Sequence, residues 1–219
     1  DGKKNVGKVI SDNYEVVEGS WPKNKNEVVL VLDENNSLSL TAVYELGLKS
    51  ASEYHDMMNQ LNSGDDVKTD TKKIDYSDVI DRTLKLLPAC DQYVKGDNGH
   101  WTYVGDDVDQ INALIDSDKA IDLKIVGVVK PVEDADATPL SSGVGYTRAL
   151  TNELIDRAES SEIVTEQRSD KDHNVLNGMT FSPSDDATKA QDARDYVASL
   201  GVSSKAQMAQ NMMAAAGAS

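Results

Sequence analysis

The sequence predicts an α+β domain with a mixed sheet and flanking helices, and three observations favour this class. Short apolar runs rich in β-branched residues lie at 28–32 and 125–129, and they have the length of buried strands. Apolar residues recur with helical spacing at 52–61 and 148–158. The strand and helix patterns alternate irregularly and show no repeat period. With 219 residues, the chain is long enough to form one large domain or two lobes.

Four strands are expected in the sheet, at residues 13–18, 27–32, 83–87 and 121–129. A polar, turn-rich connection separates the first two strands, and Pro88 closes the third. The run 121–129 is apolar on both of its faces, so we place it at the centre of the sheet. One further short strand is expected at Ile163 and Val164.

A β-hairpin is expected in the middle of the chain. Residues 92–94 and 100–104 flank a turn-rich loop of sequence Lys-Gly-Asp-Asn-Gly, which is typical of a hairpin. Its aromatic residues are the candidates for contact with a partner, because exposed aromatic side chains on a hairpin can anchor one. These candidates are Trp101, Tyr103 and Tyr93. The alternative is that the same rings pack across the hairpin and onto the core.

Capping and stop residues mark the ends of the predicted helices, which cover residues 39–46, 52–61, 107–115, 148–158, 183–200 and a last segment from Ser204. Thr147 can cap the helix 148–158, and Pro183 fits the first turn of the helix that it begins. Gly47 should supply the left-handed position after the first helix. Ser204 and Gln207 resemble a capping box.

The composition is acidic and poor in aromatic residues. The net charge is −16, from 22 Lys plus Arg against 38 Asp plus Glu, and aromatic residues make up 5%. A surface of this charge repels a phosphate backbone, so no nucleic-acid partner is expected. The charge would suit a cationic partner such as a basic peptide, and simple solubility is the alternative explanation. No apolar run approaches the roughly 18 to 20 residues that cross a bilayer.

No arrangement of residues in the sequence predicts catalysis, a cofactor or a metal. The three histidines, His55, His100 and His173, are scattered along the chain. The single cysteine, Cys90, has no CxxC partner, so we expect it to be structural. Residues 33–37 lack the glycine and the bidentate glutamate of a calcium loop and predict a turn. No nucleophile elbow, Walker loop or dinucleotide fingerprint occurs. We therefore expect no catalytic, cofactor-binding or metal-binding residues.

Seven short segments occur in an order that is informative as a set. They are EGSWP at 18–22, NEVVL at 26–30, YELGL at 44–48, DVIDRTLKL at 78–86, LKIVGVV at 123–129, GYTRALT at 145–151 and DYVASLG at 195–201. In this order and spacing they resemble the large extracytoplasmic domain of ABC transporter permeases of the MacB and FtsX-like type. Ser20 stands where that family commonly has arginine, and Asp81 stands where it has glycine.

The resemblance implies a place in the cell and an organisation. It implies that residues 1–219 form a single extracytoplasmic domain with the MacB-like core fold, excised from a longer membrane protein of a Gram-positive-type bacterium. The domain would face the cell exterior at the cell membrane, with transmembrane helices before and after it. We expect the lobes, where the domain divides, to cover about 1–50 with 120–219, and about 51–119.

The resemblance also implies a function without catalysis in this chain. In the family, a cytoplasmic ATPase subunit or domain hydrolyses ATP and acts through the transmembrane part. The extracytoplasmic domain binds an extracellular peptide or protein ligand and transmits conformational change for export or signalling. A dimer of the full transporter is a further arrangement that the resemblance allows. We therefore expect no enzymatic activity from this chain.

Two other classes of protein remain open from the residues themselves. One is a free-standing secreted binding protein or adhesin, which would need a signal peptide upstream and no ATPase partner. The other is an enzyme whose site is dispersed along the sequence. A structure would reveal such a site as a deep pocket with perturbed carboxylates.

Overall fold

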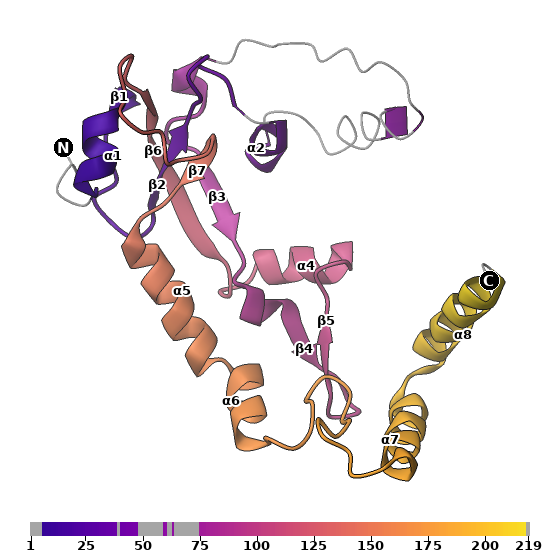
Figure 1. The fold of residues 1–219 in the computed structure, drawn as a ribbon. Helices are drawn as coiled ribbons and strands as arrows, with labels where there is room; N and C mark the ends of the chain where they lie inside the picture. The colour runs from indigo at the N-terminus through magenta and orange to yellow at the C-terminus, as the bar shows by residue number, and fades with distance from the viewer. Residues whose placement is uncertain (1–5, 39, 48–58, 61–62, 64–74, 218–219) are drawn as a thin grey trace. The chain divides into compact units, whose positions relative to one another are not determined.

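A long central strand organises the sheet in the computed structural model. This strand, β6 (Ile121–Pro131), has neighbours on both of its edges (Figure 1). β2 (Glu27–Val31) runs parallel to it on one edge. β1 (Tyr14–Gly19) and β3 (Thr83–Leu86) pair with it in the antiparallel direction. The structure describes residues 6–38, 40–47, 59–60, 63 and 75–217.

The sheet is mixed, as the sequence predicts. β7 (Gly143–Gly145) pairs antiparallel with β2 and completes the strand order β1-β6-β2-β7, with β3 also on β6. Because parallel and antiparallel pairs occur in one sheet with helices beside it, the predicted α+β class is confirmed. The central place predicted for residues 121–129 is confirmed as well, since β6 contacts three other strands.

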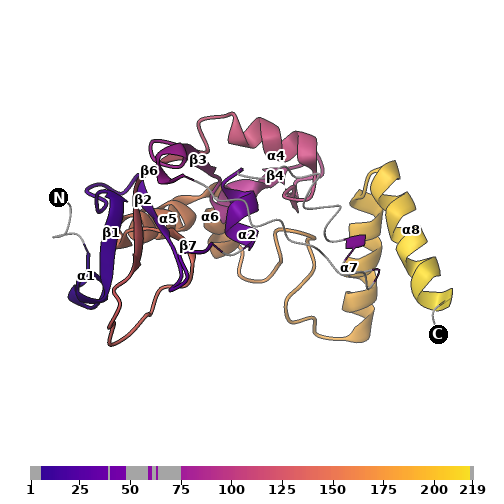
Figure 2. The same ribbon diagram turned by 90° about the horizontal axis from the view of Figure 1, so that it is seen from above.

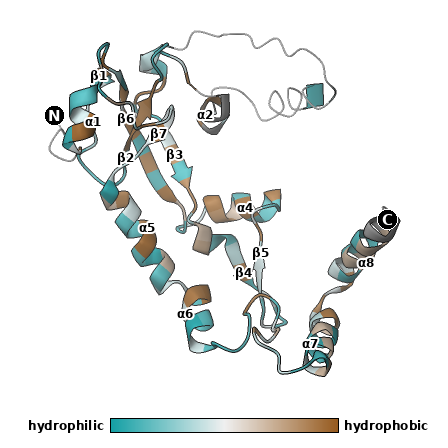
Figure 3. Cartoon of the chain, in the orientation of Figure 1, coloured by the Kyte–Doolittle hydropathy of each residue, from teal (hydrophilic) through white to brown (hydrophobic). Residues whose placement is uncertain are grey.

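Both faces of the central strands are covered by apolar side chains. Along β2, Val28 and Leu30 belong to one buried cluster, whereas Val29 and Val31 belong to another. This alternation follows from the two-residue period of a strand. Hydrophobic residues accordingly line β2 and β6 (Figure 3). Burial on both faces explains the continuous apolar runs at 28–32 and 125–129, whereas the first half of β6 alternates, with Asp122 and Lys124 exposed.

A pair of glycines allows β1 to cross close to β6. Gly19 lies opposite Gly127 in the strand register, just after an irregularity in the pairing. A Cβ atom on Gly19 would overlap the carbonyl oxygen of Val126, and one on Gly127 would overlap that of Ser20. The backbone N–H of Ser20 donates to the Val126 oxygen at 2.9 Å. Larger residues would therefore force the two backbones apart.

Short helices flank this sheet. They are α1 (Lys8–Asn13), α2 (Leu40–Glu45), the 3-10 turn η2 (Tyr76–Asp78) and the first part of α5 (Arg148–Ser160). α1 lies beside β1 in both views (Figures 1 and 2). Gly47 has φ of 62° after α2, which confirms the predicted left-handed position. Leu150 of α5 is buried in the core, and its N–H lies 3.3 Å from Thr147 Oγ1.

The chain divides into two compact units. We call Asp1–Leu86 with Ile121–Leu154 the sheet unit, and Leu87–Ala120 with Ile155–Ser219 the hairpin unit. The lobes expected from the sequence are grouped differently, since they join residues 155–219 to the sheet. Separated segments of the chain form each unit, and local patterns in the sequence do not carry that information.

The hairpin unit is made of short elements and helices. They are η3 (Ala89–Gln92), β4 (Tyr93–Lys95), β5 (Trp101–Tyr103), α4 (Val108–Ile115), α6 (Glu162–Ser169), α7 (Asp186–Ser199) and α8 (Val202–Gly217). The hairpin and the helix near 107–115 agree with the predictions. In the described part of the chain, no helix is both long enough and apolar enough to cross a bilayer.

Several predicted elements differ from the structure. Ile163 and Val164 form part of α6 instead of a strand, because Ser161 caps a helix there. The next helix begins at Asp186, after the cap Asp185, and not at Pro183. Ser204 lies inside α8 and not at its start. The predicted helix 52–61 falls outside the described residues, apart from 59 and 60.

Candidate partner-binding site

The β4–β5 hairpin carries the three aromatic residues singled out from the sequence. Tyr93 pairs with Tyr103, and Lys95 pairs with Trp101. The turn closes through the N–H of Gly96, which donates to the carbonyl of His100 at 2.9 Å. Side chains of paired residues lie on the same face of an antiparallel ribbon, and so do those of residues two apart. All three aromatic rings therefore belong to one face of the hairpin.

Trp101 is an internal anchor of the hairpin unit. Its side chain is buried, with 8% of the residue exposed, and its indole N–H donates to Glu166 Oε2 at 2.9 Å. Lys95 Nζ lies 2.7 Å from the same oxygen and 5.9 Å from the centroid of the indole ring. The backbone N–H of Trp101 also donates to Val175 at 3.0 Å. For Trp101 the structure thus favours packing within the chain over contact with a partner.

Glu166 is held as an anion by these two donors. The hydrogen bond from the Lys95 ammonium group lowers the pKa of Glu166, and the bond from the Trp101 indole lowers it further. The charged carboxylate joins α6 to the hairpin across 65 positions in the sequence. Glu166 was not predictable as a functional residue, because nothing in its local sequence separates it from the many other acidic residues.

Tyr103 is the exposed aromatic residue of the hairpin. Its ring centroid lies 5.5 Å from that of Tyr93, with the two planes tilted by 57°. Tyr103 is 48% exposed, whereas Tyr93 is only partly exposed. A Cβ atom on Gly105 would overlap the phenol of Tyr103, so the ring lies against that glycine. Of the three predicted contact residues, Tyr103 is therefore the one that offers most of its surface to solvent.

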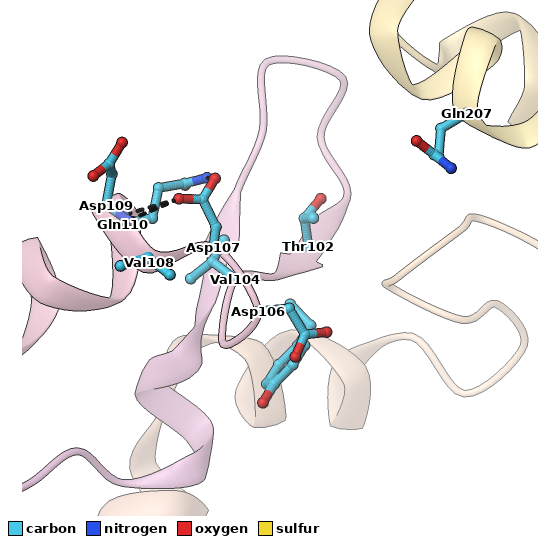
Figure 4. Close-up of a pocket in the computed structure, with 9 residues that line it drawn as sticks. Thr102, Val104, Asp106, Asp107, Val108, Asp109, Gln110 and Gln207 are labelled. Carbon is cyan, nitrogen blue, oxygen red and sulfur yellow. Dashed lines mark hydrogen bonds between the residues drawn. The ribbon is translucent and has the colours of Figure 1, made fainter. Parts of the chain in front are cut away.

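An open hollow of about 740 Å³ adjoins this part of the hairpin unit (Figure 4). It is lined by Thr102, Tyr103, Val104, Asp106, Asp107, Val108, Asp109, Gln110 and Gln207. Three of these residues are aspartates and none is a lysine or an arginine. The hollow is therefore acidic, and it contains the exposed apolar side chains of Tyr103 and Val108.

Asp107 fixes the edge of the hollow. One of its carboxylate oxygens accepts hydrogen bonds from the backbone N–H groups of Asp109 and Gln110, at 3.1 and 3.0 Å. The other oxygen accepts from the Gln110 amide at 2.8 Å, and this bond is drawn in the same close-up as the hollow (Figure 4). These bonds, led by the one from the Gln110 side chain, lower the pKa of Asp107. Asp107 thus caps α4 and stays charged.

Val108 is an exposed apolar residue at the start of α4. It has helical spacing with Ile111 and Ile115, yet it is 69% exposed. Val104, four positions earlier, is buried, and its N–H donates to the carbonyl of Gln92 at 2.9 Å. In the sequence, Val108 stands within the acidic run Asp106-Asp107-Val108-Asp109. An apolar residue surrounded by aspartates is more typical of an exposed position than of a helix face that packs on a core.

The carboxylates of the 170–192 region have structural roles. Asp170 Oδ1 accepts the backbone N–H of His173 at 2.9 Å, and this bond lowers the pKa of Asp170. Asp192 accepts the N–H of Thr180 at 2.9 Å, which lowers the pKa of Asp192. The first bond closes a turn at the start of the loop between α6 and α7, and the second joins the middle of that loop to α7.

Within the described ranges, no group of three or more His, Cys, Asp or Glu side chains could hold a metal ion. His100 lies against Gly178, whereas His55 falls outside the described residues. Residues 33–37 form the predicted turn, in which Asp33 Oδ1 accepts the N–H of Ser37 at 2.7 Å.

Cys90 is a partly buried free cysteine in η3. Burial raises the pKa of this thiol, and the negative charge of Asp91 raises it further. Asp91 in turn accepts a hydrogen bond from Arg157 Nε at 2.7 Å. Arg157 also donates to the carbonyl of Lys119 at 2.6 Å. The Arg157–Asp91 pair ties η3 to the end of α5, while the structural role expected for Cys90 stays a prediction.

Comparison of the chain with protein-family models, with curated proteins and with solved structures finds no match.

Proposed function

We propose that this chain is the extracytoplasmic domain of an ABC transporter permease, and that it acts without catalysis. In this proposal the sheet unit is the scaffold and the hairpin unit binds a partner outside the cell. Binding would be transmitted through the membrane part of the protein to a cytoplasmic ATPase. The proposal combines the resemblance of seven ordered segments with the positions that those segments take in the fold.

The observation that supports it best is where these segments lie. Six of the seven belong to the sheet unit. They include the crossing between β1 and β6, most of β2, all of β3, the core of β6 and the start of α5. Weak similarities scattered by chance would not be expected to gather on mutually paired strands. They include strands whose side chains form the buried core.

The hairpin unit supports a binding role over a catalytic one. The hollow beside Tyr103 is open, and Asp107, whose pKa is lowered, is engaged in capping a helix. A general acid needs a carboxyl group whose pKa is raised by burial. Exposed aromatic and aliphatic side chains rimmed by charge are instead typical of protein-binding surfaces.

The location can be tested with the full-length protein in cells. Val202 is the most exposed valine of the hairpin unit, and Val128 of the sheet unit is fully buried. In a Cys90→Ala background, we expect Val202→Cys to react in intact cells with a maleimide that does not cross membranes. Val128→Cys should react only after denaturation, which controls for folding. The protein should also co-purify from membranes with an ATPase subunit.

Two outcomes would contradict the proposal. Labelling of Val202→Cys only after cell lysis would place the domain inside the cell. Recovery of the labelled chain from the culture medium, without an ATPase, would favour the alternative of a free-standing secreted binding protein or adhesin. The purified domain should hydrolyse neither ATP nor a panel of ester, peptide and glycoside substrates.

A further inference from the structure

The exposed apolar residues of the described chain are unevenly distributed. In the sheet unit the large ones that are exposed are Val9 and Tyr146. The hairpin unit has many more, namely Val94, Tyr103, Val108, Ile155, Leu176, Phe181, Val197, Val202, Met212 and Met213. Contiguous exposed apolar side chains indicate an interaction surface, whereas single ones are ordinary, and of these ten Tyr103 and Val108 line one hollow.

Within the hairpin unit, the hollow combines apolar surface with negative charge. Val108 is 69% exposed, and Asp107 and Asp109 are its neighbours in the chain. Asp106 and Asp109 are exposed, and neither makes an ion pair with a described residue. Asp107 is needed for the cap of α4, but the cap leaves the other two carboxylates available.

We propose that the hollow lined by Tyr103, Val108, Asp106 and Asp109 binds a basic peptide segment that also carries apolar side chains. The inference rests on the proposed function and specifies the chemistry of the partner. Lysine or arginine side chains of the segment pair with Asp106 and Asp109. An apolar side chain of the segment covers Val108 and the ring of Tyr103.

Charge complementarity selects this occupant. The hollow has three carboxylates and no basic side chain, so an acidic or phosphorylated segment would be repelled. The whole chain, at −16, adds long-range attraction for a cation. A second copy of this chain would carry the same negative charge and would be disfavoured. The apolar contacts would then determine which cationic segments remain bound, because charge alone mainly affects encounter.

Purified protein and two synthetic peptides test the proposal. One peptide alternates lysine with leucine, and the other has the same length and alternates glutamate with leucine. Fluorescence anisotropy should show binding of the lysine peptide, weakening as salt is added, and no binding of the glutamate peptide. Binding of both peptides, or binding that salt does not weaken, would overturn the proposal.

Matched double variants distinguish binding at the hollow from general attraction to the acidic surface. Asp106→Asn with Asp109→Asn should weaken binding of the lysine peptide at least about ten-fold. Asp134→Asn with Asp136→Asn removes the same charge from an exposed acidic loop of the sheet unit, and should change binding less than about two-fold. Equal effects of the two double variants would show attraction to the whole surface and would overturn the site.

The apolar part of the site has its own pair of variants. Val108→Ser should weaken binding, whereas Val202→Ser, at a valine that is 87% exposed on α8, should leave it unchanged. Unaltered Trp101 fluorescence shows that the hairpin of each variant is folded. If Val202 is labelled from outside the cell but the lysine peptide does not bind, this inference fails and the proposed function stands. If the peptide binds but labelling requires lysis, the proposed function fails.

Discussion

The two units of this chain are held together in different ways. The sheet unit buries two apolar clusters, one on each face of β2 and β6, and Val28, Val128 and Val129 are completely inaccessible. In the hairpin unit, the buried apolar residues that the structure describes are Leu87, Trp101 and Val104. Its elements are joined instead by charged side chains that bridge distant segments, such as Glu166 and Arg157.

This difference indicates how one chain can combine a scaffold with a binding surface. Burial of apolar area contributes roughly 25 cal/mol per Å² and does not depend on exact geometry. Charged hydrogen bonds near the surface contribute less, and they require specific positions of both partners. Apolar side chains that are not needed in a core are free to remain exposed. The hairpin unit has such side chains, and the sheet unit has few of them.

The largest effect is expected when a core leucine is truncated. Leu30→Ala in the sheet unit should lower the free energy of unfolding by about 2–5 kcal/mol, because it opens a cavity between β2 and its neighbours. Leu176→Ala in the hairpin unit is the matched control, since Leu176 is exposed, and it should cost less than about 1 kcal/mol. Urea denaturation followed by tryptophan fluorescence measures both. Equal losses would contradict the comparison of the two units.

A smaller effect is expected at the anchor of the hairpin. Glu166→Ala leaves the buried indole N–H of Trp101 without its acceptor and should cost about 1–3 kcal/mol. Glu166→Gln keeps an acceptor and should cost less. Glu159→Ala is the control, because its pairing with Arg168 is exposed, and it should cost less than about 0.5 kcal/mol. If Glu166→Ala and Glu159→Ala lowered the free energy of unfolding by the same small amount, the Glu166 carboxylate would not stabilise the hairpin.

The smallest expected effect is a difference between the two units in the pH at which acid destabilises them. The pKa shifts determine which unit is destabilised first. Lowered pKa values at Glu166, Asp170 and Asp192 mean that the folded hairpin unit binds protons less readily than the unfolded chain. Their stabilisation is fully present above the ordinary carboxyl pKa of about 4. It is lost as the pH falls through the lower values of the folded state. The hairpin unit should therefore loosen before the sheet unit on acidification.

The two tryptophans allow this order to be measured, because each unit has one. Trp21→Phe leaves Trp101 to report on the hairpin unit, and Trp101→Phe leaves Trp21 to report on the sheet unit. We expect the Trp101 signal to change at a higher pH than the Trp21 signal. Coincident transitions would contradict this order and show that the units unfold together. The sheet unit also has a carboxyl group with a lowered pKa, Glu27, whose pKa is lowered chiefly by the backbone N–H of Lys23.

Local patterns predicted the elements whose own residues decide them. The strand at 27–32 and the central strand 121–129 were predictable because they contain the continuous apolar runs 28–32 and 125–129. The hairpin was predictable because a glycine-rich turn separates two aromatic segments. The prediction of a short strand at Ile163 and Val164 was wrong. β-branched residues favour strands only weakly, and the cap residue Ser161 favours a helix there.

The sequence by itself determined the α+β class, the central strand, the acidity of the surface and the presence of an aromatic hairpin. Only the tertiary structure decided which aromatic side chain is buried. Trp101 is held by bonds to Glu166 and Val175, more than sixty positions away, whereas the ring contact described for Tyr103 is with Tyr93 of the same hairpin, and Tyr103 remains half exposed. The periodicity of a sequence describes neighbours along the chain. The contacts that separate an anchor from a binding surface depend on how distant segments come together.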